Sequence, residues 1–69
     1  MNESLWQYCV LKHPTPEQRK NGGRTEIVLP VSDWVLAENE REVVMIATRR
    51  IPEEHMEDAG RLEVGVRPF

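Results

Sequence analysis

The segment that most constrains the fold is Leu5–Lys12, a run of aromatic and β-branched residues that stops before Pro14. These residue types predict a β-strand. Side chains of a strand alternate between its two faces. Both faces here carry apolar groups: Trp6, Tyr8 and Val10 on one, and Leu5, Cys9 and Leu11 with Gln7 on the other. That pattern predicts a central strand, or an edge strand covered by a partner.

Two further extended segments are predicted. Arg24–Leu36 forms the second extended region, and Pro30 places it at a sheet edge or bends it, because proline cannot donate to a sheet ladder. A bulge or turn is expected at Ser32–Asp33, after which Trp34–Ala37 resumes the extended structure. Arg61–Arg67 is the third strand, since Leu62, Val64 and Val66 alternate with Glu63, Gly65 and Arg67.

The clearest predicted helix begins after Asn39 and ends at about Arg50, before Pro52. Its inward stripe comprises Val43, Ile46, Ala47 and Arg50, widened by Val44 and Ile51. A short acidic helical turn, closed by Gly60, is expected over Pro52–Asp58. The segment 13–23 is predicted to be a loop or insert with one helical turn, because Thr15 and Gln18 have the spacing of a capping box.

The predicted order is therefore β-β-α-β in a single small α+β domain over residues 1–69, a three-stranded antiparallel sheet with one helix packed on one face. The strand Leu5–Lys12 is expected at its centre. Compactness scaling gives a radius of gyration of roughly 11 Å. A core this small supplies only about 3–5 kcal/mol, so a partner surface is expected to help hold the fold.

One helix cannot cover both faces of this sheet, so some apolar surface is expected to remain exposed. Such patches on small domains mark association sites. Four aromatic residues cannot all fit under one helix, and these are the predicted contact residues: Trp6, Tyr8, Trp34 and Phe69.

No catalytic, cofactor-binding or metal site is predicted. Cys9 and His13 lie four residues apart, which is about 13 Å along a strand and too far for a nucleophile and its base. His55 could approach Cys9 from its turn, but no pattern requires it. The carboxylates around His55 lack the spacing of a calcium loop and are interpreted as a solvated face. The single cysteine also excludes an internal disulfide and a zinc site of clustered cysteines.

Charge and hydropathy bear on the remaining classes of partner. The formal net charge is −3, which argues against a general polyanion binder. Aromatic residues that could stack on bases, together with the basic residues Arg19, Lys20 and Arg24, keep a nucleic-acid-binding regulator as a weaker alternative. No apolar run approaches the roughly 18–20 residues of a membrane helix, and the N-terminus lacks signal-peptide features, so the cytoplasm is the default compartment.

The second half of the chain resembles a known group of sequences. Ile51-Pro52-Glu53-Glu54 and the terminal Val66-Arg67-Pro68-Phe69 are the specific pieces of a layout that covers Ile27–Phe69. The layout resembles short proteins encoded in tailed-bacteriophage genomes, most of them without an assigned function. The proline-rich segment 13–23 is not part of the pattern, and no catalytic motif comes with it.

The resemblance implies a non-enzymatic interaction protein, a small virion component of the capsid or tail that sits on or between larger subunits. The expected locations are the virion or the host cytoplasm during infection. The alternative is a soluble phage factor that binds and inhibits a host protein. Homo-oligomerisation stays open, and no cofactor is expected.

Overall fold

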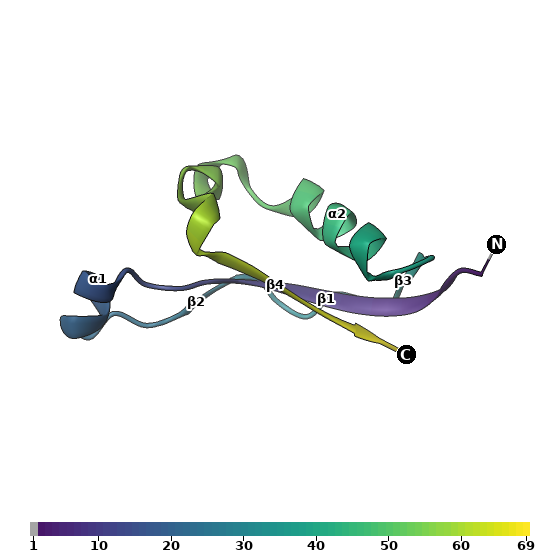
Figure 1. Ribbon diagram of the computed structural model, residues 1–69, viewed down its shortest axis with the longest axis horizontal. Helices are drawn as coiled ribbons and strands as arrows, with labels where there is room; N and C mark the ends of the chain where they lie inside the picture. Colours follow the sequence, from purple (N-terminus) through teal and green to yellow (C-terminus); the bar gives the residue numbers. More distant parts are fainter. Residues whose placement is uncertain (1) are drawn as a thin grey trace.

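β1 (Ser4–Lys12) runs through the centre of the fold in a computed structural model that describes residues 2–69 (Figure 1). The elements follow in the order β1 (Ser4–Lys12), α1 (Pro16–Lys20), β2 (Glu26–Leu29), β3 (Val35–Ala37), α2 (Glu40–Arg50), the 3-10 helix η1 (Glu53–Arg61) and β4 (Leu62–Pro68). All strands pair with β1 and all pairings are antiparallel. The predicted α+β fold, with the first strand at the centre and one helix packed on one face, is confirmed.

The two sides of β1 are paired differently. On one side, β4 runs the length of β1, from Trp6 opposite Pro68 to Lys12 opposite Leu62. On the other side, β2 pairs with one end of β1 and β3 with the other end. The predicted second extended region is therefore two short strands, and the sheet has four strands.

Pro30 and Ser32 account for this break. Pro30 has no N–H to donate, so the chain leaves the ladder after β2. Ser32 then pins the connection to β1: its N–H donates to the Tyr8 carbonyl at 2.8 Å, and its hydroxyl accepts from the Tyr8 N–H at 3.0 Å. β3 resumes pairing only at Val35.

A register shift in β2 changes which of its side chains face the core. Val10 lies opposite Leu29, whereas Leu11 lies opposite Ile27, so Val28 is the extra residue of a bulge. Leu29 therefore shares a face with Val10 and packs against the core, while Ile27 is 67% exposed on the other face.

The core lies between α2 and one face of the sheet. The buried residues are Tyr8, Val10, Ala37, Val43 and Ala47. α2 begins as predicted, because the Asn39 side chain accepts from the Glu42 N–H at 2.9 Å. Near its other end, the Arg50 guanidinium donates to the Tyr8 hydroxyl and lies 5.7 Å from the centre of the Tyr8 ring.

The molecule is longer than compactness scaling predicts. Its extents are 47 × 21 × 16 Å and its radius of gyration is 13.6 Å, because the hairpin of β1 and β2 carries α1 beyond the part of the sheet under α2 (Figure 1). The predicted capping box of α1 is confirmed: the Gln18 N–H donates to Thr15 Oγ1 at 3.1 Å, and the Thr15 N–H donates to Gln18 Oε1 at 3.0 Å. Gly22, with φ of +85°, completes the turn.

Candidate interaction surface

α2 and η1 both lie on one side of the sheet, so the opposite face has no helix over its centre (Figure 1). We call this the open face. The strand register assigns its residues, because directly opposed residues point the same way. They are Leu5, Gln7, Cys9 and Leu11 of β1, Glu63, Gly65 and Arg67 of β4, Ile27 of β2 and Leu36 of β3, joined by Trp34 and Phe69 beside them.

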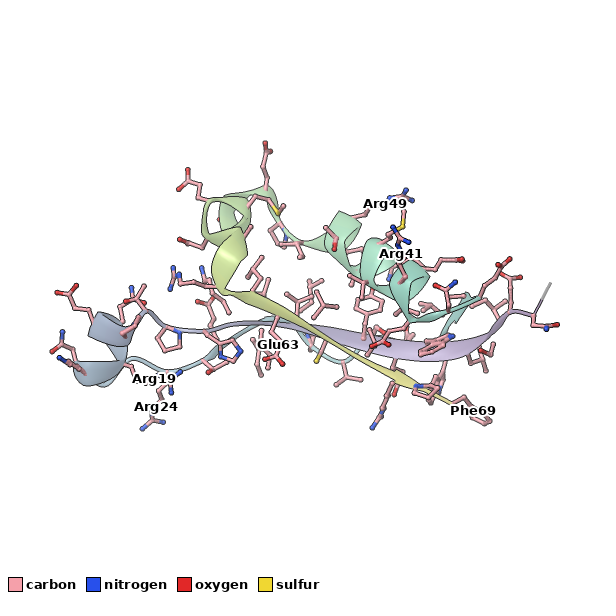
Figure 2. The ribbon with its side chains drawn as sticks, viewed as in Figure 1. Arg19, Arg24, Arg41, Arg49, Glu63 and Phe69 are labelled. Carbon is pink, nitrogen blue, oxygen red and sulfur yellow. The ribbon has the colours of Figure 1, made fainter. Side chains whose placement is uncertain are left out.

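The end of the open face beneath the N-terminal half of β1 is aromatic. The rings of Trp34 and Phe69 meet edge to face, with centroids 5.2 Å apart and planes at 79°. The Phe69 N–H donates to the Leu5 carbonyl at 2.9 Å and so extends the pairing of β4 by one residue. Phe69 is nevertheless 85% exposed, and in Figure 2 it points away from the side that carries α2. Leu36, opposite Leu5, is 58% exposed.

Gln7 organises the polar centre of the open face. Its Oε1 accepts from Nε and Nη2 of Arg67, at 2.8 and 2.6 Å, and its Nε2 donates to the Ser32 carbonyl at 2.9 Å. Both ends of the amide are thus engaged, and the fork of two donors holds the Arg67 guanidinium against Gln7 of β1.

A shallow hollow of about 270 Å³ lies beside this network. It is lined by Gln7, Tyr8, Cys9, Val31, Gly65, Val66 and Arg67. Gly65 and Cys9 lie close together in its lining, because a Cβ at Gly65 would lie 3.1 Å from the Cys9 sulfur. The hollow therefore offers an apolar floor with one guanidinium at its rim, which suits an apolar side chain of another protein.

The four predicted contact residues divide between the two faces. Trp34 is 42% exposed, and together with Phe69 it forms the aromatic end of the open face. Tyr8 is 3% exposed and belongs to the core, so it is not a surface contact. Trp6 is half-buried, packs against the core and donates its indole N–H to the Ala37 carbonyl at 3.2 Å. The reason is alternation, since Trp6 and Tyr8 share the face of Val10 beneath α2.

Three residues of the open face were not among the predicted contact residues: Leu36, Ile27 and Arg67, although the alternation of Arg61–Arg67 placed Arg67 away from the core. The alternation of Leu5–Lys12 carried a usable signal, because any residue paired with an odd-numbered position of that strand shares its face. Leu36 lies opposite Leu5, Ile27 opposite Leu11, and Arg67 opposite Gln7. The pairing itself could not be derived from one sequence.

The structure separates the residues considered for nucleophilic chemistry. Cys9 lies on the open face, whereas His55 of η1 contacts Lys12 Nζ through Nδ1 at 3.1 Å, on the side of the sheet that carries the helices. His13 is engaged elsewhere: its Nε2 lies 2.6 Å from Glu63 Oε1, and its Nδ1 lies 3.2 Å from Thr25 Oγ1. Within residues 2–69, no three side chains of the metal-binding types gather closely enough to hold an ion.

Charges hold η1 in place over the end of β1. Asp58 lies 3.0 Å from Nη2 of Arg61 and 3.6 Å from Nζ of Lys12. The hydrogen bond and charge of Arg61, helped by Lys12, hold the pKa of the Asp58 carboxyl below its ordinary value. Arg61 also donates to the His13 carbonyl at 3.1 Å and to Gln18 Oε1 at 3.0 Å, so it ties η1, β1 and α1 together.

Comparison with protein-family models, with curated proteins and with solved structures finds no significant match to this chain. In the part of the chain that the structure describes, no helix has the length and apolar character needed to cross a membrane.

Proposed function

We propose that the chain is a non-enzymatic protein–protein interaction module that docks through its open face onto a larger protein subunit. The observation that carries the proposal is the exposed aromatic pair of Trp34 and Phe69 beside Leu36. Isolated apolar side chains on a surface are ordinary, but a contiguous group that includes two aromatic rings has the composition of an interface centre.

The docking geometry follows from how the surface is built. Trp34 and Phe69 are already in contact, and Phe69 is held by its backbone bond to Leu5, so few side chains must be ordered on binding. Aromatic anchors of this kind carry a large share of binding energy in protein interfaces. The hollow beside Gly65 would receive an apolar side chain of the partner, with Arg67 at the rim to donate to a carboxylate or carbonyl of the partner.

The resemblance to tailed-phage sequences supplies the setting. In this setting the chain is an accessory component of the capsid or tail, bound to a larger structural subunit and located in the virion. Residues 2–69 bury only five core residues, and a domain with so small a core gains stability from such a partner.

Mass spectrometry of purified particles of the encoding phage tests this proposal. We expect the chain at fixed stoichiometry after a high-salt wash. A phage carrying Trp34→Ala with Phe69→Ala should lose the chain from its particles, while Met45→Ala, an exposed apolar residue of α2, should retain it.

Two results would contradict the proposal. Absence of the wild-type chain from particles, with the chain present in the infected-cell lysate, would overturn the virion setting and favour the host-binding factor. Retention of the double variant would overturn the open face as the docking surface. As a control, the purified double variant should unfold at nearly the same temperature as the wild type, because both altered side chains lie outside the core.

A further inference from the structure

The outer edge of β4 is a second uncovered surface, which borders the open face along Glu63, Gly65 and Arg67. Among residues 2–69, β4 pairs with β1 alone. In Figure 1, β4 is drawn in front of β1 and no other element crosses in front of it. Among residues 2–69, no other strand therefore pairs with this edge.

Two backbone bonds establish which groups this edge presents. The Phe69 N–H donates to the Leu5 carbonyl, and the Arg61 carbonyl accepts from the His13 N–H. Backbone groups of a strand alternate in direction, so odd-numbered residues of β4 face β1 and even-numbered residues face outward.

Two of the outward-facing residues of β4 have both a backbone N–H and a carbonyl free for pairing. Leu62 already donates its N–H to the Ala59 carbonyl, and Pro68 has no N–H. Val64 and Val66 each present an N–H and a carbonyl outward.

This edge lacks the devices that keep strands from pairing with other chains. Such devices are prolines, bulges, inward charges, lysines or a covering element. The opposite edge of the sheet has several: Pro30, the bulge at Val28 and the break before β3. On β4, the only proline is the last residue of the strand, Pro68.

We propose that a second copy of this chain pairs with the β4 edge, antiparallel, about a twofold axis at Gly65. In this register Val64 of each copy lies opposite Val66 of the other. Each of these two pairs exchanges two backbone hydrogen bonds, so four are formed. Glu63 of each copy lies opposite Arg67 of the other, so the twofold axis generates two such ion pairs. The order Glu63-Val64-Gly65-Val66-Arg67 is thus self-complementary, with apolar residues toward the helices and opposite charges on the open face.

Each charged group is held by a residue in or next to β1 and keeps one atom for this contact. Glu63 uses Oε1 to bind His13, and Arg67 uses Nε and Nη2 to bind Gln7. Among the described residues neither Glu63 Oε2 nor Arg67 Nη1 has a partner, so both remain for the second copy. Gly65 places no side chain between the two charge pairs.

Neighbouring registers are less favourable. A shift by one residue sets outward backbone groups opposite inward ones and forms no ladder. A shift by two in one direction brings Arg67 opposite Arg61 of the second copy, which juxtaposes like charges. A shift by two in the other direction places Glu63 opposite Phe69 and removes both ion pairs.

The helices leave room for this dimer. The twofold axis is perpendicular to the sheet, so both α2 helices lie on the same side. The two β1 strands would be three strand spacings apart, about 14 Å, and packed helices need only about 8–10 Å between their axes.

Charge reversal of the full-length chain tests the register. The mass of the wild type in solution, measured by light scattering over a concentration series, should approach that of two chains. Arg67→Glu alone sets two glutamate pairs across the interface, and Glu63→Arg alone sets two arginine pairs. Each should raise the dimer dissociation constant about tenfold or more.

An equimolar mixture of the two single variants is the decisive sample. A copy with arginine at both positions pairs with a copy with glutamate at both, so both cross-strand pairs are complementary again. We expect the mixture to recover the mass of two chains. Arg24→Glu and Glu26→Arg make the same changes in net charge at the opposite edge and should leave the dimer unaffected.

A wild type that keeps the mass of one chain at every concentration would overturn the proposal. So would single variants that dimerise like the wild type, or a mixture that does not dimerise when the wild type does. Trp34 precedes β3, and its ring contacts Phe69 beyond the end of β4, outside residues 63–67 that form the proposed contact. Trp34→Ala should therefore not change the dimer, so this result is independent of docking through the open face.

Discussion

A set of three valine-to-alanine variants measures how much the buried core contributes to the free energy of unfolding. Val10 of β1 and Val43 of α2 are both fully buried, whereas Val31 is 60% exposed in the connection between β2 and β3. The same chemical change is thus made in a buried strand, in a buried helix and at the surface. The three positions separate loss of packing from backbone preference.

The expected costs follow from burial and local structure. Each variant removes two carbons, worth about 1.6 kcal/mol of transfer free energy when buried. A residual cavity of on the order of 40 Å³ adds about 1 kcal/mol. In α2 this is partly offset, because alanine is favoured over valine by about 0.6 kcal/mol, so Val43→Ala should cost about 2 kcal/mol. In β1 the preference runs the other way, so Val10→Ala should cost about 3 kcal/mol. Val31→Ala should cost under about 0.5 kcal/mol.

Urea unfolding followed by circular dichroism measures these differences. All variants are compared at one protein concentration, because self-association adds to apparent stability. If a domain of this size has about 3–5 kcal/mol in total, Val10→Ala should retain only about 0–2 kcal/mol of stability. A cost for Val43→Ala equal to or above that of Val10→Ala, or a cost for Val31→Ala near 2 kcal/mol, would refute the assignment of these faces.

Three further predictions test local contacts. The Cβ of Gly65→Ala would crowd the Cys9 sulfur, so a double-mutant cycle should find Gly65→Ala less favourable, by about 1 kcal/mol, in the wild type than in a Cys9→Ala background. Asn39→Ala should cost about 1 kcal/mol in thermal unfolding through loss of the α2 cap, while Asn39→Asp should not. Because Arg61 lowers the pKa of Asp58, ionised Asp58 stabilises the fold above its unfolded-state pKa of about 3.9, and this is lost as pH falls through the lower folded-state pKa. Acid unfolding of Asp58→Asn should therefore be less steep than that of the wild type below about pH 4.

The local signals of the sequence were sufficient for the elements and for the centre of the sheet. Apolar residues on both faces of Leu5–Lys12 predicted the central strand, which has partners on both sides. The caps at Asn39 and Thr15 depend on residues three apart, so they could be predicted from spacing alone. The alternation of β4 likewise predicted its buried and exposed faces.

The features that depend on pairing could not be predicted in the same way. The bulge at Val28 is a property of β2 against β1, and without it Ile27 and Leu29 would share a face. The burial of the aromatic residues also depends on tertiary packing. Alternation places Trp6 and Tyr8 on one face of β1, but only the position of α2 determines which face is buried. The resulting surface joins Trp34 before β3, Leu36 within β3 and Phe69 at the C-terminus, and no short pattern contains all three.

The two proposed surfaces would reinforce each other. A twofold axis perpendicular to the sheet puts the open faces of both copies on the same side, so the dimer would present two Trp34–Phe69 pairs to one surface. Capsids and tails repeat the same subunit at regular spacing, and a bivalent module gains avidity there only if its two sites match that spacing. The dimer should therefore bind the assembled partner more tightly than it binds an isolated partner subunit. For a monomeric variant of the chain, the two affinities should be equal. Equal affinity of the dimer for both forms of the partner would show that the two sites do not act together.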